Sequence, residues 1–387
     1  VRGVPLAASG SNLQKPAVAG QNIVLTLDIA MQKQLETILE NGVKKSKAEA
    51  GSALIMDVKT GAVKAMANFP TYDPSKYFDV DDAALFSNGA VTHPIEVGSI
   101  MKPLTTVAAL DKGVIRANQT YHDPARWKVD DFYITNIEED GGAGTRSVTD
   151  ILNLSLNTGV TWELMQMGGG SLNMKARSAW YDYMTNRFRF GAPTGIEQGY
   201  EASGYVPKPE DNDAGINLTY ANTAFGQAMT ATPVQMAGAM AGVLNGGTYN
   251  RPHLVAGTLD KDGNLAAAKP EVVARNIIAP KASSELIPMM QRTIDTHNPV
   301  PPFDQNRYTV GGKTGTAQIA KPGGGYYENE FNGTYIGFVG GETPEYVVVV
   351  FMHKPKVAGY AGTAAAQPVF VDAAHMLINN SYVTAKN

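Results

Sequence analysis

Val97-Gly-Ser-Ile-Met-Lys-Pro103 places a hydroxyl and an amine three residues apart, at Ser99 and Lys102. Positions i and i+3 share one face of a helix, so in a helical segment the Lys102 amine reaches the Ser99 oxygen. A serine with its own base beside it is an activated nucleophile. The apolar run 104–110 that follows predicts that Ser99 lies at a helix start, where the helix N-terminus also stabilises a developing oxyanion.

A lysine is a poor base near neutral pH, because the ordinary pKa of its amine is about 10.4. Burial and a second nearby cation both lower the pKa of an amine. Pro103 and the apolar flank favour a buried position for Lys102, and Lys313, which belongs to a later motif, is the candidate second cation. We therefore predict that Ser99 is the nucleophile and Lys102 its base.

Two Ser-Leu-Asn tripeptides, 155–157 and 171–173, compete for the second part of the site. The later copy follows three glycines and is typical of a helix start. The earlier copy lies inside the apolar run 151–160, where polar side chains need partners to be buried. We therefore predict that Ser155 and Asn157 belong to the site.

Two Lys-Thr-Gly tripeptides compete in the same way for the third part. Lys59-Thr-Gly61 precedes Ser99 and occupies an expected hairpin turn, for which Thr-Gly is ordinary. Lys313-Thr-Gly-Thr-Ala-Gln318 instead continues a strand, and its small residues let a substrate backbone approach and pair with it. The downstream copy is the predicted one, with four site residues: Lys313, Thr314, Gly315 and Thr316.

Composition excludes several classes of function. The chain has 387 residues, and 43% of them are hydrophobic, which is enough for a sizeable core. Its net charge of -4 argues against a basic surface that would bind a nucleic acid. The absence of cysteine excludes disulfides, thiolate zinc sites and a cysteine nucleophile. The six histidines lack metal-ligand spacing, so we predict neither a metal nor a cofactor. A Gly-x-Ser-x-Gly elbow is also absent, which argues against an α/β-hydrolase.

The order of expected elements predicts an α/β protein with an inserted all-helical lobe. Hydrophobic patterns predict strands over 23–27, 51–58, 62–67, 308–319, 334–339 and 346–352, helices over 29–47 and 364–378, and mostly helix over 100–245. The Gly-rich segment 322–330 is expected to be a hairpin loop overlooking the site. The longest apolar run, Val347–Met352, is too short to span a membrane and predicts a buried central strand. Residues 1–20 have the composition of a linker, and a start at Val1 suggests the soluble part of a longer protein whose anchor lies upstream.

The three motifs, in this order, resemble those of the class B penicillin-binding proteins, the D,D-transpeptidases that cross-link bacterial peptidoglycan. The resemblance covers about 21–380 and includes segments 50–57, 65–70, 90–99, 225–235 and 355–368. It is greatest to the division-specific, septal type, with the elongation-specific type as the alternative. Val97 stands where proline is usual, and Leu156 where serine is common, but neither residue takes part in the chemistry.

The resemblance implies a penicilloyl-serine transferase fold, with a central antiparallel sheet covered by helices. Residues 21–387 would form the transpeptidase domain, with its sheet part at about 21–80 and 245–387 and its lobe at about 81–244. Backbone N–H groups of Ser99 and Thr316 would form the oxyanion hole. Ser155 would relay a proton to the leaving amine, and Asn157 would orient Lys102 and hold the substrate amide. The remaining residues, Lys313, Thr314 and Thr316, would bind the substrate carboxylate.

The implied ligands are peptidoglycan stem peptides ending in D-Ala-D-Ala and the β-lactams that mimic them. The implied partners are a membrane glycan polymerase and other division-complex proteins, at the extracytoplasmic face of the cell membrane near the septum. The membrane would be reached only through the upstream anchor. One rival is a β-lactamase or D,D-carboxypeptidase on the same fold, although the second motif lacks the central Asp of a class A β-lactamase. The other rival is a β-lactam sensor without turnover.

Overall fold

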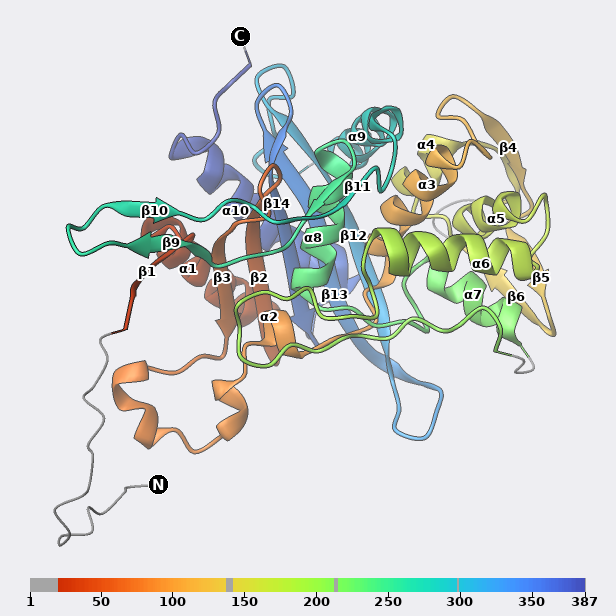
Figure 1. Cartoon of the computed structure of the whole chain (residues 1–387). Coiled ribbons are helices and arrows are strands. Elements are labelled where there is room, and N and C mark those ends of the chain that lie inside the picture. Colours follow the sequence, from red (N-terminus) through yellow and green to blue (C-terminus); the bar gives the residue numbers. More distant parts are fainter. Residues whose placement is uncertain (1–19, 137–141, 212–214, 298, 387) are drawn as a thin grey trace, which may run out of the picture.

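The computed structural model describes residues 20–136, 142–211, 215–297 and 299–386. A five-stranded antiparallel sheet in the order β12-β13-β14-β2-β3 forms its centre (Figure 1). The strands are β2 (Ala50–Asp57), β3 (Val63–Phe69), β12 (Thr309–Ala320), β13 (Tyr326–Gly340) and β14 (Pro344–His353). Strand β14 is the middle strand, and its residues 347–352 are all buried, which confirms the buried central strand predicted from that apolar run.

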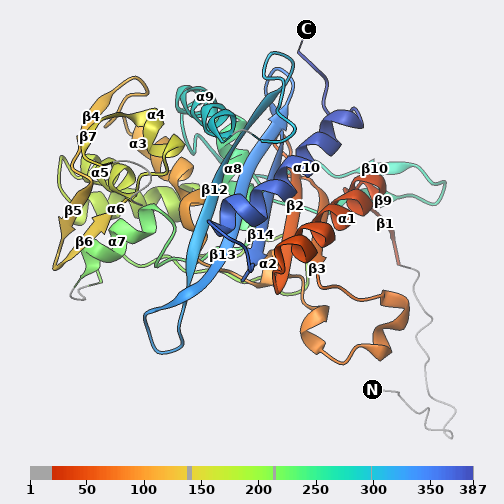
Figure 2. The ribbon, with the colours of Figure 1, turned by 180° about the vertical axis from the view of Figure 1, so that it is seen from behind.

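Both faces of the sheet are covered, because successive side chains of a strand point to opposite faces. Ile55 and Val350 pack into one core with helices α1 (Ile29–Ser46) and α10 (Gln367–Asn379), which cross the sheet in Figure 2. Leu54 and Val349 pack into the second core on the opposite face. There α8 (Pro233–Leu244) is buried at every residue, which explains why its sequence is apolar on every side apart from Gln235 in its first turn.

The inserted lobe surrounds the second core with short helices. They are α2 (Gly89–Thr92), α3 (Lys102–Asp111), α4 (Val148–Asn153), α5 (Asn157–Met167), α6 (Met174–Asp182), α7 (Ile216–Ala224) and the 3-10 helix η3 (Gly98–Met101). The expectation of an all-helical lobe was wrong in one respect: β4 (Thr120–Asp123) pairs with β7 (Gly144–Ser147), and β5 (Arg126–Val129) pairs with β6 (Phe132–Thr135). These four-residue strands are too short to give a clear alternating pattern in the sequence.

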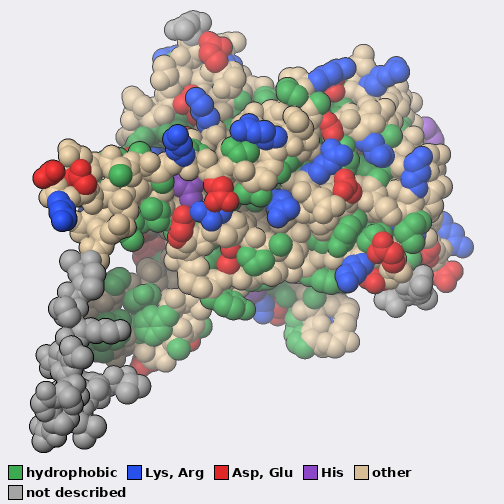
Figure 3. Space-filling model, in the orientation of Figure 1, with side chains coloured by type: hydrophobic (Ala, Val, Ile, Leu, Met, Phe, Trp, Pro, Cys, Tyr) green, Lys and Arg blue, Asp and Glu red, His purple; other side chains and the backbone are tan. Residues whose placement is uncertain are grey.

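The remaining elements are distributed over the lobe and the surroundings of the main sheet. They are β1 (Asn22–Leu25), η1 (Pro74–Asp79), η2 (Ala83–Phe86), η5 (Tyr183–Arg187), β8 (Thr248–Asn250), β9 (Val255–Leu259), β10 (Leu265–Ala267), β11 (Val272–Arg275), α9 (Pro280–Thr296) and η6 (Gly362–Ala366). Strands β1, β9 and β10 form a three-stranded sheet, and β8 pairs with β11. On the face shown in Figure 3, Lys and Arg side chains are interspersed with Asp and Glu side chains.

Two expectations about loops need comment. The hairpin loop predicted over 322–330 is shorter, because β13 already begins at Tyr326, where it pairs with Ala320. The turn itself contains Gly323, Gly324 and Gly325, all with positive φ. The predicted linker, residues 1–20, lies outside the described residues except for Gly20. The division into sheet part and lobe at residues 81 and 244 stays a prediction.

Candidate active site

Ser99 lies in η3, a single turn that leads directly into α3, whose first residue is Lys102. Gly98 precedes it with a φ of +63°, in the region that favours glycine. A Cβ at Gly98 would lie only 3.0 Å from the carbonyl oxygen of Thr316. This glycine therefore lets the Ser99 turn approach strand β12, so that the first and third motifs lie side by side.

The Lys102 amine brings the first and second motifs together. Its side chain is fully buried, and its Nζ donates to Asn157 Oδ1 at 2.8 Å and to Ser155 Oγ at 3.1 Å. It also donates to the backbone oxygen of Ser155. Ser155 has a φ of +57°, an uncommon conformation for a residue other than glycine, and it turns both its oxygens toward the amine. The ring of Phe225 lies 6.0 Å from the Lys102 amine.

The third motif occupies β12, the strand at one edge of the main sheet. Lys313 is 1% exposed, and its Nζ donates to the backbone oxygen of Thr314 at 3.2 Å. A Cβ at Gly315 would lie 2.2 Å from Thr334 Oγ1 and 2.9 Å from the oxygen of Val97, so only glycine fits there. An edge strand offers unpaired backbone groups to an extended peptide, which can pair with it as a further strand.

A cavity of about 340 Å³ receives side chains from all three motifs. Ser99, Ser155, Thr314 and Thr316 line it, together with Asn153, Leu154, Thr296, His297, Tyr360 and Thr363. None of these six is among the site residues predicted from the sequence. Asn153 and Leu154 lie at the end of α4. The other four come from the end of α9 and from the segment around η6, and only the packing of these segments against β12 brings them to the cavity. The sequence holds no local signal for such contacts.

The unused copies of the two tripeptides lie in local structures of their own. Lys59 is exposed in the β2–β3 turn, where the backbone N–H of Thr60 donates to Asp57 Oδ1 at 2.8 Å. Asn173 is the N-cap of α6 and accepts from the backbone N–H of Ala176 at 3.0 Å. Ser171 is exposed. Both copies thus have structural roles, a turn and a helix cap.

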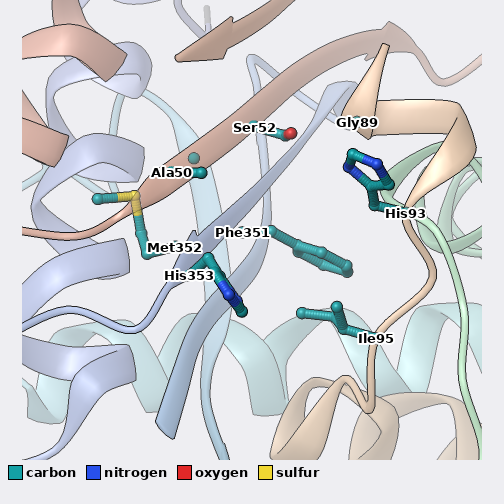
Figure 4. Close-up of a pocket in the computed structure, with 9 residues that line it drawn as sticks. Ala50, Ser52, Gly89, His93, Ile95, Phe351, Met352 and His353 are labelled. Carbon is teal, nitrogen blue, oxygen red and sulfur yellow. The ribbon is translucent and has the colours of Figure 1, made fainter. Parts of the chain in front are cut away.

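A second cavity of about 300 Å³ lies against the ends of β2 and β14 (Figure 4). Ser52, His93, Ile95, Phe351 and His353 are among the residues that line it. Burial lowers the pKa of His353, and its Nδ1 lies 2.8 Å from Asn332 Oδ1. No residue of the three motifs is among those that line this cavity in the described part of the chain.

Glu96 links the nucleophile segment to the β12–β13 hairpin. Its Oε1 accepts from the hydroxyl of Tyr326 at 2.9 Å and from the backbone N–H of Ala228 at 2.9 Å. Burial raises the pKa of this carboxyl. Across the described residues, neither a cluster of three metal-ligating side chains nor a helix long and apolar enough for a membrane is found.

The fold is that of the penicilloyl-serine transferase class. The chain belongs to the penicillin-binding protein transpeptidase domain family, whose model matches residues 51–375. This confirms the resemblance found in the sequence, and the fold class predicted from it.

Three relatives illustrate the relationship. The chain is 27% identical to the peptidoglycan D,D-transpeptidase FtsI homolog of Mesostigma viride, over 89% of this chain and 59% of the relative. It is 28% identical to the penicillin-binding protein PbpB of Mycobacterium tuberculosis, over 98% of this chain and 55% of the relative. The crystal structure of penicillin-binding protein 3 from the same organism, complexed with ampicillin, superposes with a TM-score of 0.85 at 25% identity, covering 97% of this chain and 81% of that one. The chain thus spans between half and two thirds of the length of these two curated relatives.

Proposed function

We propose that the chain is the catalytic domain of a peptidoglycan D,D-transpeptidase that works through a serine acyl-enzyme. One observation carries the proposal: the buried Lys102 amine is held by Ser155 and Asn157 one helical turn from Ser99, beside the cavity that β12 borders. One groove then holds the nucleophile, the base, the proton relay and the strand that binds the peptide.

In the acylation step, the oxygen of Ser99 attacks the carbonyl carbon of the penultimate D-alanine, and Lys102 takes the hydroxyl proton. The backbone N–H groups of Ser99 and Thr316 stabilise the oxyanion, a contribution of about 3 kcal/mol to lowering the barrier in comparable sites. The bond to the terminal D-alanine then breaks, and Ser155 passes the proton from Lys102 to the leaving amine. The contact between Lys102 and both oxygens of Ser155 supports this relay.

The substrate's terminal carboxylate would be bound by Lys313, Thr314 and Thr316, with the peptide lying along β12 as an added strand. In the second step, an amine of a neighbouring stem peptide attacks the ester carbonyl and releases Ser99. A β-lactam acylates the same oxygen, but its leaving group stays attached to the acyl group, so the ester persists. The ampicillin complex of the related penicillin-binding protein 3 supports binding of this ligand class.

The biological setting is also part of the proposal. Relatives named FtsI support a role in septal wall synthesis at the extracytoplasmic face of the membrane. A relative in Bacillus subtilis is named stage V sporulation protein D, so a role in another wall-building process is the alternative. A membrane glycan polymerase and other division proteins would be the partners, reached through segments beyond this domain.

The substitution Ser99→Ala tests the proposal. We expect loss of covalent labelling by a fluorescent penicillin and of D-alanine release from a stem-peptide substrate, with an unchanged melting temperature, because only one oxygen atom is removed. Mass spectrometry of the penicillin-treated parent chain should place the adduct on Ser99. Stoichiometric labelling of the variant would refute the assignment. Labelling of the parent without any D-alanine release, with or without an acceptor amine, would instead favour a β-lactam sensor.

A further inference from the structure

Glu163 of α5 is a buried acid that the mechanism above does not use. Its side chain is fully buried, and Oε2 accepts from the hydroxyl of Thr106 at 2.9 Å. Its other oxygen, Oε1, is buried and has no hydrogen-bond donor among the described residues. A buried carboxylate with one oxygen unpaired is costly, because it loses the water that would solvate its charge. Near neutral pH, such a carboxyl group is therefore either in its neutral, protonated form or close to a positive charge.

That nearby charge is the Lys102 amine. Thr106, which holds Glu163, lies four residues after Lys102 on α3 and so on the same helix face. Asn157, which accepts from Lys102, begins the same helix α5 that carries Glu163. Burial raises the pKa of Glu163, the hydrogen bond from Thr106 and the positive charge of Lys102 lower it, and the net result is a pKa of about 8. The charge of Glu163 therefore depends on the balance between its burial and these two neighbours.

Other ionisable groups packed around α5 have hydrogen-bond partners of their own. On β4, Asp123 accepts from the hydroxyls of Tyr121, at 3.1 Å, and Thr158, at 2.6 Å. Burial raises the pKa of Tyr121, so the phenol stays neutral. On β7, Arg146 donates to the oxygen of Gly142.

Helices α4 and α6, which also contact α5, bring further charged groups. Asp150 of α4 closes the capping box with Ser147. Arg177 of α6 donates to the backbone oxygen of Pro209 and to Asn217. Lys102 remains the charged partner that acts on Glu163.

We propose that Glu163 is a positioning residue for Lys102, a buried acid whose charge sets how firmly the catalytic amine holds its proton. The inference rests on the proposed function, in which Lys102 is the base. When Glu163 is neutral, it does not stabilise the ammonium form of Lys102, and the amine releases its proton more readily. When Glu163 is ionised, it stabilises the ammonium form, which cannot accept the proton of Ser99.

The isosteric variant Glu163→Gln tests this inference, because glutamine keeps an oxygen for Thr106 but never ionises. The measurement is the rate constant of acylation by a fluorescent penicillin between pH 5 and pH 9. In this variant, we expect the rate to rise at a pH about one unit lower than in the parent. We also expect its pH dependence to fit a single ionisation. The control is Glu36→Gln, the same change on the exposed face of α1, whose profile should match the parent. A purely structural role would lower the rate equally at every pH, and that result would overturn the inference.

Thr106→Val provides a second variant in case the first one fails to fold. It removes the donor that lowers the pKa of Glu163, so the acid stays neutral to higher pH and the profile moves in the same direction. An unmoved profile in the folded variant contradicts the inference.

Unfolding of the parent chain gives a readout that does not depend on activity. The folded pKa of Glu163 is raised, so its stabilising effect is complete below pH 4.5 and is lost as the pH rises toward 8. Glu163→Gln should remove this loss, so that the melting temperature falls less between pH 5 and pH 8 than in the parent. Equal slopes for parent and variant would show that Glu163 does not titrate, and the inference would fall. A parent that unfolds as expected but is not acylated by penicillin would instead refute the proposed function, and with it the role for Lys102.

Discussion

The chain carries the tripeptide Lys-Thr-Gly twice, and its two copies have opposite environments. At 59–61 it forms the turn between β2 and β3, where Lys59 is exposed and Thr60 Oγ1 donates to Asp57 at 2.7 Å. At 313–315 it lies within β12, where Lys313 is 1% exposed and Gly315 leaves no room for a Cβ. The same three residues therefore stabilise a turn in one place and border the proposed active site in the other.

This contrast shows that a motif acquires its chemistry from what packs around it. Burial and neighbouring charges control the charge state and the orientation of a lysine, whereas an exposed lysine is solvated and mobile. The two Ser-Leu-Asn tripeptides both lie at the start of a helix, but only the first of them contacts Lys102. Paired substitutions in the matching copies put this conclusion to the test.

The largest difference is expected for the lysines. Lys313→Ala should lower the rate of acylation by penicillin roughly 100-fold, because a charged donor to the ligand carboxylate is lost. Lys59→Ala, the same change in the turn, should alter that rate less than about twofold, since its amine is exposed. Stopped-flow or gel-based labelling measures both. Comparable losses in the two variants would show that the upstream copy takes part in the chemistry.

A smaller difference is expected for the asparagines. Asn157→Ala should lower the acylation rate about tenfold, because the Lys102 amine loses the acceptor at 2.8 Å that orients it. Asn173→Ala should leave the rate unchanged and lower the free energy of unfolding by about 1 kcal/mol, since α6 loses its N-cap. Chemical denaturation and labelling of both variants separate the two effects. A rate defect in the Asn173 variant would contradict the assignment.

The smallest difference is expected for the threonines. Thr314→Val should slow acylation about threefold, because one neutral hydroxyl donor to the carboxylate is removed from the cavity. Thr60→Val should leave acylation as it is and destabilise the β2–β3 turn, whose hydroxyl contact with Asp57 is lost. If Thr314→Val acylates as fast as the parent, the carboxylate does not rely on this hydroxyl.

Local patterns in the sequence were sufficient for much of the fold. The spacing of Met31, Leu35 and Leu39 predicts α1, and all three are buried in the structure. The run Val347–Met352 predicts the central strand β14. Such predictions succeed because helix and strand periods act over a few residues. The short strands β4 to β7 were missed for the same reason, because four residues do not establish a period.

The sequence by itself determined the family and the order of the three motifs, and it predicts the pairing of Ser99 with Lys102, because these depend on matched segments or on residues within a helical turn of each other. Only the tertiary structure decided that Lys102 meets Ser155, 53 residues away, and that Tyr360 and His297 line the same cavity. It also decided that Glu163 is buried where the charge of Lys102 acts on it. Contacts between distant segments depend on how whole elements pack, and short-range sequence patterns carry no record of that packing.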